Sequence, residues 1–107
     1  MNEGITKRKY PRRTYECLVG VLSKGQYLIG NSFEIGEMGM LIGSEHELSE
    51  NDRIVLSFHV DNNLASVIQG TIKYHSNKDG VDKYGVQFND SNFSVRRIIR
   101  RYVSERT

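Results

Sequence analysis

Hydrophobic and polar residues alternate in steps of two along most of the chain, which is the pattern of half-buried β-strands. Arg53–Val60 is the clearest case, because every second residue from Ile54 onward is apolar. Near the end of the chain the step lengthens to that of a helix. We predict strands at Tyr15–Leu22, Gln26–Ile35, Met40–Ile42, Arg53–Val60, Leu64–His75 and Lys83–Asn89.

Short polar segments separate the predicted strands. Ser23–Gly25 and Asp61–Asn63 have the length of hairpin turns, and Ser76–Asp82 is expected to form a longer polar turn. The acidic stretch Gly43–Asp52 is expected to be a loop, and Gly36–Gly39 to be irregular.

Gly70 interrupts the longest predicted strand. Glycine weakens a strand and often lies where strand pairing is irregular, so we expect a bulge or bend at this position. Ile68, Ile72 and Tyr74 are expected to share one face of the same strand.

A helix is predicted at residues 91–106, with Asp90 or Ser91 able to cap its start. Its apolar stripe consists of Val95, Ile98, Ile99, Tyr102 and Val103. Its other face carries Arg96, Arg97, Arg100 and Arg101. Like charges four residues apart destabilise a helix by about 0.2–0.5 kcal/mol a pair, so the apolar stripe and acids on the barrel must hold it in place. We interpret this face as solvated or paired within the chain rather than as a partner site.

Short strands without intervening helices, followed by one helix, predict a mainly β fold, a small antiparallel barrel of six or seven strands with a C-terminal α-helix. A length of 107 residues suits one domain. We predict a flexible N-terminus at residues 1–6 and a single domain at 7–107. Within it we predict a basic arm at 7–13, the barrel at 14–90 and the helix at 91–106.

The composition is that of a soluble protein with a modest core, with 37% hydrophobic and 26% charged residues. No apolar run approaches the roughly 18 residues of a membrane span, and the single Cys17 fits a reducing compartment, so we expect a cytoplasmic protein. Ten of the fifteen cations lie in residues 7–13 and 96–106, whereas residues 14–95 hold eleven acids and five cations. Basic ends on an acidic body favour a compact anion site over the broad basic face of a general nucleic-acid binder.

Residues for catalysis or metal binding form no recognisable pattern. His46, His59 and His75 lack ligand-like spacing, and one cysteine cannot complete a zinc site. The chain has no phosphate-binding loop, dinucleotide fingerprint or nucleophile elbow. We therefore expect a protein that is not an enzyme and that uses neither a metal nor a cofactor.

The most basic stretch, Lys7–Arg13, reads KRKYPRR and holds five cations and no acid. Pro11 fixes its own φ and favours an extended Tyr10, so the stretch is expected to be a semi-extended arm. Arg8 and Arg12 lie four residues apart on this arm. Their guanidinium groups offer forked donors that match phosphate and flat faces that stack on aromatic rings, so the arm predicts an anion site.

Together with the rest of the chain, these residues resemble the PilZ domain. Arg8 and Arg12 match the basic RxxxR motif of that family, and Tyr84–Phe88 is similar to its late YGxxF strand. The resemblance extends from Arg8 through the predicted helix, and it implies a barrel of the split-barrel type.

The second motif of the family, (D/N)xSxxG in a turn at a strand end, is matched in part. Aligned on Gly39, the chain has Glu34 at the first position and Gly36 at the serine position. The other frame, with Asn31 first, places Phe33 at the serine position and loses the register of the next strand. In the preferred Glu34 frame, the carboxylate is one methylene longer and a hydroxyl is absent. These changes either weaken ligand contacts or mark a site that has lost its ligand.

PilZ domains are bacterial receptors for cyclic di-GMP, and the resemblance implies this ligand here. It implies that Arg8 and Arg12 hold phosphates and stack on guanine, and that the Glu34 carboxylate accepts hydrogen bonds from guanine. The other residues of the implied site are Arg13, Gly36 and Gly39. Lys7, just before the RxxxR pair, predicts room for the charge of a second, stacked ligand molecule.

The resulting hypothesis is a non-catalytic receptor that binds cyclic di-GMP and passes a ligand-induced change to an unidentified effector protein. One alternative is a degenerate PilZ module that acts only through protein contacts. The second alternative is a small nucleic-acid-binding barrel, since basic ends and aromatic residues on strands also suit single strands. Because most of the basic residues lie near the two ends of the chain, nucleic acid is the less favoured partner.

Overall fold

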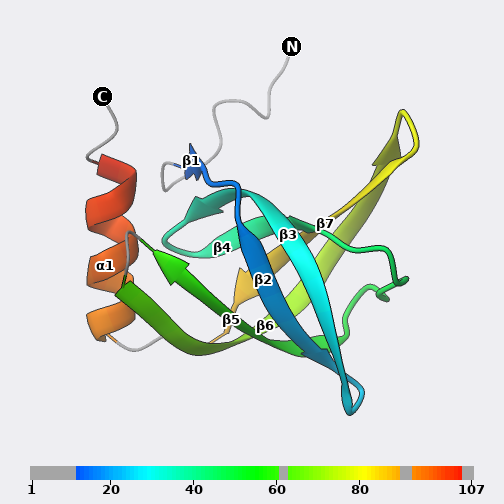
Figure 1. Cartoon of the computed structure of the whole chain (residues 1–107), viewed down its shortest axis with the longest axis horizontal. Coiled ribbons are helices and arrows are strands. Elements are labelled where there is room, and N and C mark those ends of the chain that lie inside the picture. The colour runs from blue at the N-terminus through cyan, green and yellow to red at the C-terminus, as the bar shows by residue number, and fades with distance from the viewer. Residues whose placement is uncertain (1–11, 61–62, 90–92, 105–107) are drawn as a thin grey trace.

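Six antiparallel strands form a closed barrel, with a short seventh strand beside it and one helix packed against it (Figure 1). The computed structural model describes residues 12–60, 63–89 and 93–104. The elements are β1 (Arg12–Thr14), β2 (Leu18–Ser23), β3 (Gln26–Gly36), β4 (Gly39–Gly43), β5 (Arg53–Val60), β6 (Asn63–Lys78), β7 (Val81–Phe88) and α1 (Phe93–Ser104). The predicted fold class, a small antiparallel barrel with a C-terminal helix, is confirmed.

The barrel closes on β3, which pairs with three other strands. Residues 26–31 of β3 pair with β2, and residues 31–36 pair with β4. The last residues, 34–36, also pair with β1 on the opposite edge. The order β3-β2-β5-β6-β7-β4 thus returns to β3, and β1 lies outside the closed ring.

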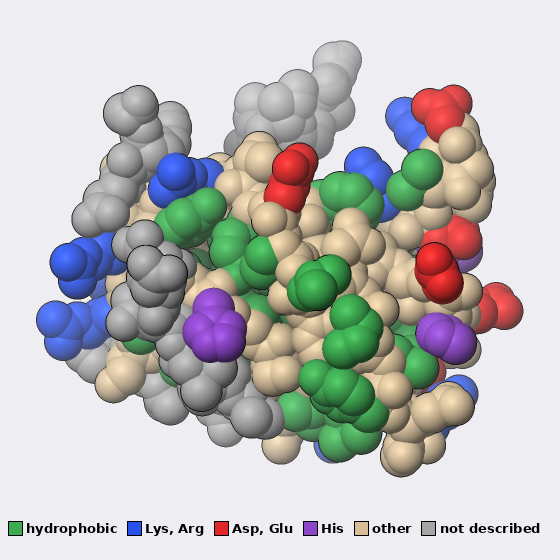
Figure 2. Space-filling view, viewed as in Figure 1, with side chains coloured by type: hydrophobic (Ala, Val, Ile, Leu, Met, Phe, Trp, Pro, Cys, Tyr) green, Lys and Arg blue, Asp and Glu red, His purple; other side chains and the backbone are tan. Residues whose placement is uncertain are grey.

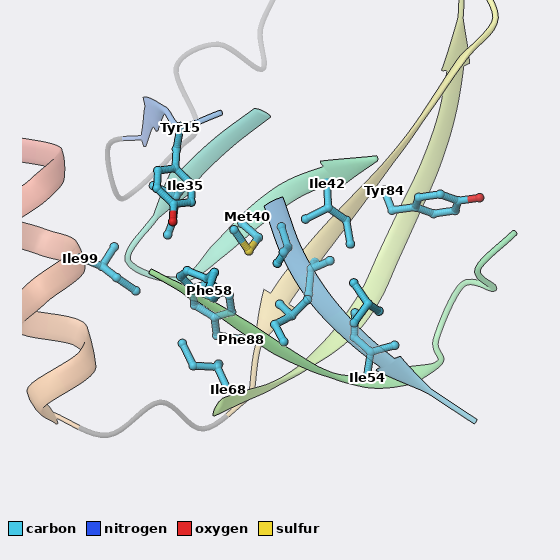
Figure 3. Packing of buried hydrophobic residues seen from close by; sticks show 14 of the residues in the cluster. Tyr15, Ile35, Met40, Ile42, Ile54, Phe58, Ile68, Tyr84, Phe88 and Ile99 are labelled. Carbon is cyan, nitrogen blue, oxygen red and sulfur yellow. The ribbon is translucent and has the colours of Figure 1, made fainter. Parts of the chain in front are cut away.

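The core lies inside the barrel and between the barrel and α1. Alternation along the strands places one apolar set inward, and Figure 3 shows these side chains converging from several strands. The Phe58 and Phe88 rings stack with centroids 6.3 Å apart, and Ile99 closes the cluster from the helix side. Tyr84, Val86 and Phe88 are all buried, as the alternation along this strand predicts.

The first predicted strand begins later than expected. Strand β2 starts at Leu18, and the segment from Tyr15 to Cys17 belongs to no strand, although the Tyr15 amide donates to the Phe33 carbonyl at 2.9 Å. The Ser32 amide donates to the Cys17 carbonyl at 2.9 Å, and the buried Ser32 hydroxyl donates to the Tyr15 carbonyl. Burial also raises the pKa of the Tyr15 hydroxyl above its ordinary value.

The polar turn predicted at Ser76–Asp82 is wrong. Strand β6 continues to Lys78, and the turn is limited to Asp79 and Gly80, both with positive φ. Positive φ at both central residues is typical of a tight hairpin turn, in which the backbone twist matches that of the strands. Lys24 and Gly25 have the same conformation between β2 and β3. Here local turn geometry outweighed the polarity of the flanking residues.

Of the bulge or bend predicted at Gly70, the bulge is wrong. It pairs regularly with Ile54 on β5 and Phe88 on β7. A Cβ at this position would lie 2.6 Å from a Val86 methyl carbon, so the glycine allows close packing. The register instead shifts between Ile72 and Tyr74.

This shift changes the alternation of the strand. Ile68 and Ile72 are buried as predicted, but Tyr74 is 45% exposed and does not share their face. An extra residue in one strand reverses which side chains point inward beyond it.

The helix buries the stripe that the sequence indicates, with Val95, Ile99 and Val103 nearly inaccessible to solvent. Acids on the barrel were expected to hold the basic face of the helix, and one of them is Glu37, whose carboxylate accepts hydrogen bonds from Arg100.

In the described part of the chain no helix is long and apolar enough to cross a membrane. Residues 1–11, 61–62, 90–92 and 105–107 lie outside the described residues. The flexible N-terminus, most of the arm, the Asp61–Asn63 turn, the capping residues and the end of the predicted helix therefore stay predictions.

Ile72→Ala is expected to lower the free energy of unfolding by about 2–5 kcal/mol, because it leaves a cavity in a fully buried part of the core. Ile29→Ala is the matched control, since Ile29 is also on a strand but is 55% exposed. Urea denaturation of dilute protein measures both. Equal losses for the two variants would contradict the core described above.

Candidate functional site

Alternation along β1 sends its two arginines to opposite faces. Arg12 pairs with Gly36 and Arg13 pairs with Ile35, so each arginine shares a face with its partner on β3. Arg12 therefore lies beside Glu34, with its Nη1 atom 3.6 Å from Glu34 Oε1. Both side chains are partly exposed, so this ion pair positions Arg12 more than it stabilises the fold.

A bulge in β3 sets the faces of Glu34 and Ile35. In the pairing with β4, Ser32 is opposite Ile42 and Glu34 is opposite Leu41, so Phe33 is the extra residue. Before the bulge even-numbered residues such as Ser32 point inward, and after it Ile35 does. The bulge therefore turns the Glu34 carboxylate out of the core and toward Arg12.

The β3–β4 turn is held tightly against β7. Gly36 pairs with Gly39 across the turn, leaving Glu37 and Met38 at its tip. A Cβ on Gly39 would lie 2.2 Å from the Val86 carbonyl oxygen, which explains why this position has no side chain. The Phe88 amide donates to the Met38 carbonyl at 2.8 Å and fixes the tip.

A cavity of about 410 Å³ opens between this turn, β1 and the β6–β7 pair. From β1 and the β3–β4 hairpin it is lined by Arg12, Gly36, Glu37, Met38 and Gly39. From β6 and β7 it is lined by Lys73, Tyr74, Gly85, Val86 and Gln87. Two cations, a partly exposed aromatic ring and three glycine positions without side chains give it the room and the chemistry to hold a flat anionic ligand.

The Tyr74 ring lies directly over Gly85. A Cβ on Gly85 would be 2.1 Å from a ring carbon of Tyr74, so only glycine lets the ring lie there. The ring is 45% exposed at the cavity wall and offers a stacking surface. The sequence analysis missed Tyr74 as a site residue, although the Tyr84–Gly85 pair was a signal that something packs closely on that strand.

Glu37 joins the cavity to the helix. Its side chain is only 8% exposed, and its Oε2 atom lies 2.6 Å and 2.9 Å from two guanidinium nitrogens of Arg100 and 3.4 Å from Arg96. A nearly buried carboxylate requires such partners, because removing a charge from water is costly without them. The sequence analysis did not identify Glu37, whose position between the two glycines of the turn was the only available signal.

Arg13 forms a second link to the helix. Its guanidinium carbon lies 4.0 Å from the centroid of the Tyr102 ring, and its Nη1 atom donates to the Tyr102 carbonyl at 2.8 Å. The Tyr102 hydroxyl donates to the Thr14 carbonyl at 3.2 Å. A cation at the last carbonyls of a helix also interacts favourably with the helix dipole.

The structure thus brings three of the predicted site residues together, with Arg12, Gly36 and Gly39 lining one cavity. Glu34 lies beside Arg12, and Arg13 lies on the other face against Tyr102. Lys7 and Arg8 lie outside the described residues. Among the residues that are described, no three His, Cys, Asp or Glu side chains gather as metal ligands would.

Comparison with protein families gives a match to the PilZ domain that covers residues 6–105. None of the curated proteins matches this chain.

Several solved structures share the fold. The Bacillus subtilis inhibitor of motility MotI/DgrA has a TM-score of 0.81 and 14% sequence identity, over 94% of this chain and 50% of that one. The PilZ domain of YcgR from Escherichia coli, solved with c-di-GMP, has a TM-score of 0.75 and 17% identity, over 92% of this chain and 90% of that one. PlzA of Borreliella burgdorferi, in complex with c-di-GMP, has a TM-score of 0.69 and 16% identity, over 94% of this chain and 42% of that one. The chain therefore spans half or less of MotI/DgrA and PlzA.

Glu37→Gln is expected to lower the free energy of unfolding by about 1–3 kcal/mol, because it removes the charge that two arginines face at a nearly buried position. Glu47→Gln changes an exposed acid in the loop after β4 and is expected to have little effect. Urea denaturation at low and high salt measures both variants. A Glu37 variant as stable as the control would show that the link contributes nothing to the fold.

Proposed function

This chain belongs to the PilZ domain family, and on that premise we propose that it is a non-catalytic receptor that binds cyclic di-GMP and signals to an effector protein. Two of the structures that share its fold were solved with this ligand. The ligand carries two phosphates and two guanines, so a receptor needs cations and flat surfaces in one place.

The observation that carries the proposal is the cavity at the β3–β4 turn. It brings Arg12 of the RxxxR motif together with Gly36 and Gly39 of the second motif, although these residues come from different strands. Arg8 belongs to the same motif four residues earlier. A guanidinium group beside positions that carry no side chain leaves room for a phosphate to approach its forked donors.

The proposed roles follow from the chemistry of the lining. Arg12 and Arg8 hold the phosphates and stack on a guanine, and Lys73 adds a point charge from β6. The Glu34 carboxylate accepts from guanine N–H groups once Arg12 turns to the ligand. Tyr74 supplies a ring for stacking, which is worth about 1–3 kcal/mol for a base on an aromatic side chain.

The proposed signal passes to α1 through the two links described above. Arg13 is adjacent to the ligand residue Arg12 and holds Tyr102, and Glu37 is adjacent to Gly36 and holds Arg100. A shift of either strand end on binding therefore changes the contacts of the helix. In this proposal the effector protein reads the position or exposure of α1.

Calorimetric titration with cyclic di-GMP tests the proposal, with GMP and a single-stranded oligonucleotide as comparisons at two salt concentrations. We expect saturable binding of cyclic di-GMP that weakens with salt, because phosphate contacts are screened. A stoichiometry of two nucleotides per chain would support the role proposed for Lys7. Binding of the oligonucleotide alone, or of nothing, would overturn the receptor proposal.

Arg12→Ala is expected to weaken cyclic di-GMP binding by about tenfold or more, since one charge-assisted hydrogen bond is worth roughly 1.5–3 kcal/mol. Arg8→Ala is expected to act in the same way. The control is Arg53→Ala, an exposed arginine of β5 away from the cavity. Calorimetry reports the affinities, and melting temperatures near that of the parent chain show that the fold is kept. Equal affinities for the Arg12 and Arg53 variants would refute the role of the arm.

Tyr74→Ala is expected to weaken binding by about fivefold or more through loss of the stacking surface. Tyr27→Ala is a matched control, because Tyr27 is on a strand, is 61% exposed and does not line the cavity. Fluorescence titration with a labelled cyclic di-GMP compares the two. If both variants bind as the parent does, Tyr74 is only a wall of the cavity.

Glu34→Asp combined with Gly36→Ser restores the family pattern and is expected to strengthen binding, by a few kcal/mol at most. Among the described glycines only Gly25 and Gly80 have positive φ, so the backbone at Gly36 accepts a serine without conformational strain. Glu34→Asp alone separates the two contributions. A double variant that binds no better than a weakly binding parent would show that the alignment of the second motif is mistaken.

A further inference from the structure

The outer face of β2 and β3 carries a group of apolar side chains that the barrel does not use. Leu18 is 72% exposed, Leu22 42%, Tyr27 61% and Ile29 55%. In the strand register Leu22 is opposite Tyr27 and Ile29 is opposite Gly20, so the four side chains are neighbours. Figure 2 shows hydrophobic side chains gathered over these two strands on the side facing the viewer. We call these four residues the β2–β3 face; a patch of this kind usually marks an interaction site.

The outward residues of β2 and of the positions just before and after it read symmetrically about Gly20, with Glu16 ahead of the strand and Lys24 in the turn that follows it. Every second position from residue 16 to residue 24 reads Glu16, Leu18, Gly20, Leu22 and Lys24. A leucine thus stands on each side of the glycine, with an acid beyond one leucine and a cation beyond the other. Lys24 lies 3.5 Å from Asp52 but is 71% exposed, and the exposed Arg53 next to Asp52 keeps this end cationic.

The centre of the face is occupied by an aromatic ring. The Tyr27 hydroxyl lies 2.2 Å from the place of a Cβ on Gly20, so the ring leans across β2 at the midpoint of the pattern. Tyrosine is among the residues that contribute most to protein interfaces, because its ring is large and loses little conformational freedom. Beside Leu18 the surface is hollowed by about 300 Å³ between Leu18, Asn31 and Phe33.

From this pattern we propose that the β2–β3 face is a homodimer interface, in which a second copy of this chain packs through a two-fold axis running across the strands at Gly20. Such an axis lays β2 on β2 of the second copy in the opposite direction. Leu18 then faces Leu22 of the second copy, next to the hollow, and the two Tyr27 rings meet at the centre. Glu16 of each copy faces Lys24 of the other, so both charged ends are paired.

This interface is separate from the cavity at the β3–β4 turn. None of the residues named for it lines that cavity, and Arg12, Tyr74 and Gly39 are absent from the β2–β3 face. Dimerisation therefore leaves the cavity open, and each proposal can fail without the other.

Sedimentation velocity over a wide range of protein concentration tests the dimer, with charge reversals as the decisive variants. Glu16→Lys places like charges opposite each other twice in every dimer, and so does Lys24→Glu. Each is expected to raise the dimer dissociation constant by about tenfold or more. Glu47→Lys and Lys78→Glu make the same changes at exposed positions outside the face and are expected to leave it unchanged.

An equimolar mixture of the Glu16→Lys and Lys24→Glu chains is expected to dimerise as the parent does. In the mixed dimer the introduced lysine faces the introduced glutamate, and the remaining Lys24 faces the remaining Glu16. In a parallel contact the parent would already have like charges opposite each other, so neither variant alone would weaken it. Weakening by each variant alone, together with recovery in the mixture, therefore identifies the antiparallel contact. A mixture that stays as weak as its components would overturn the proposed arrangement.

Tyr27→Ala and Tyr74→Ala complete the test in a crossed design. Tyr27→Ala is expected to raise the dimer dissociation constant by about tenfold or more while cyclic di-GMP titration is unchanged. Tyr74→Ala is expected to weaken cyclic di-GMP binding and to leave the dimer dissociation constant unchanged. A parent chain that stays monomeric at every concentration, or a dimer that survives Tyr27→Ala and both charge reversals, would refute this interface.

Discussion

Strand β3 is the constraint on which the rest of the structure depends. One strand of 11 residues pairs with β2 along its first half, with β4 along its second half and with β1 at its end. Closing the ring in this way removes the open edges that a sheet would otherwise present. It also places β1 and the β3–β4 turn side by side, because β1 and β4 are both paired to residues 34–36. The candidate site is therefore a consequence of how the barrel closes.

The same strand end connects the site to the helix. The period of two along β1 turns Arg12 toward the cavity and Arg13 toward Tyr102, so neighbouring arginines contribute to different surfaces. Across the turn, Glu37 lies at the cavity and is also paired with Arg100. If α1 were held only by its apolar stripe, a movement of the β3–β4 turn would not change the contacts of the helix. These two polar links are the contacts through which, in the proposed function, binding at the turn would reach the helix.

The β2–β3 face carries apolar side chains that are exposed to water. Leu18, Leu22, Tyr27 and Ile29 face water on a barrel whose core is already filled by the opposite faces of the same strands. In a single copy of the chain these apolar side chains are left largely in water, where apolar surface is unfavourable. A row that reads symmetrically about Gly20 suits an isologous contact, because Leu18 then meets Leu22 of a second copy and Leu22 meets Leu18 in return.

The sequence by itself determined the fold class, the inward faces of most strands, the helix stripe and the family motifs, because these depend on residue type and on a local period of two or 3.6. It did not determine the shift at Tyr74, the bulge at Phe33 or the two-residue turn at Asp79 and Gly80, where one extra or missing residue reverses the side-chain faces. Only the tertiary structure placed Arg12 and Arg13 on opposite faces of β1. It also placed Lys73 and Tyr74 in the cavity wall and brought Glu37 into contact with Arg100. Those contacts join residues that are far apart in the chain, and their geometry depends on a pairing register that hydrophobic alternation leaves open.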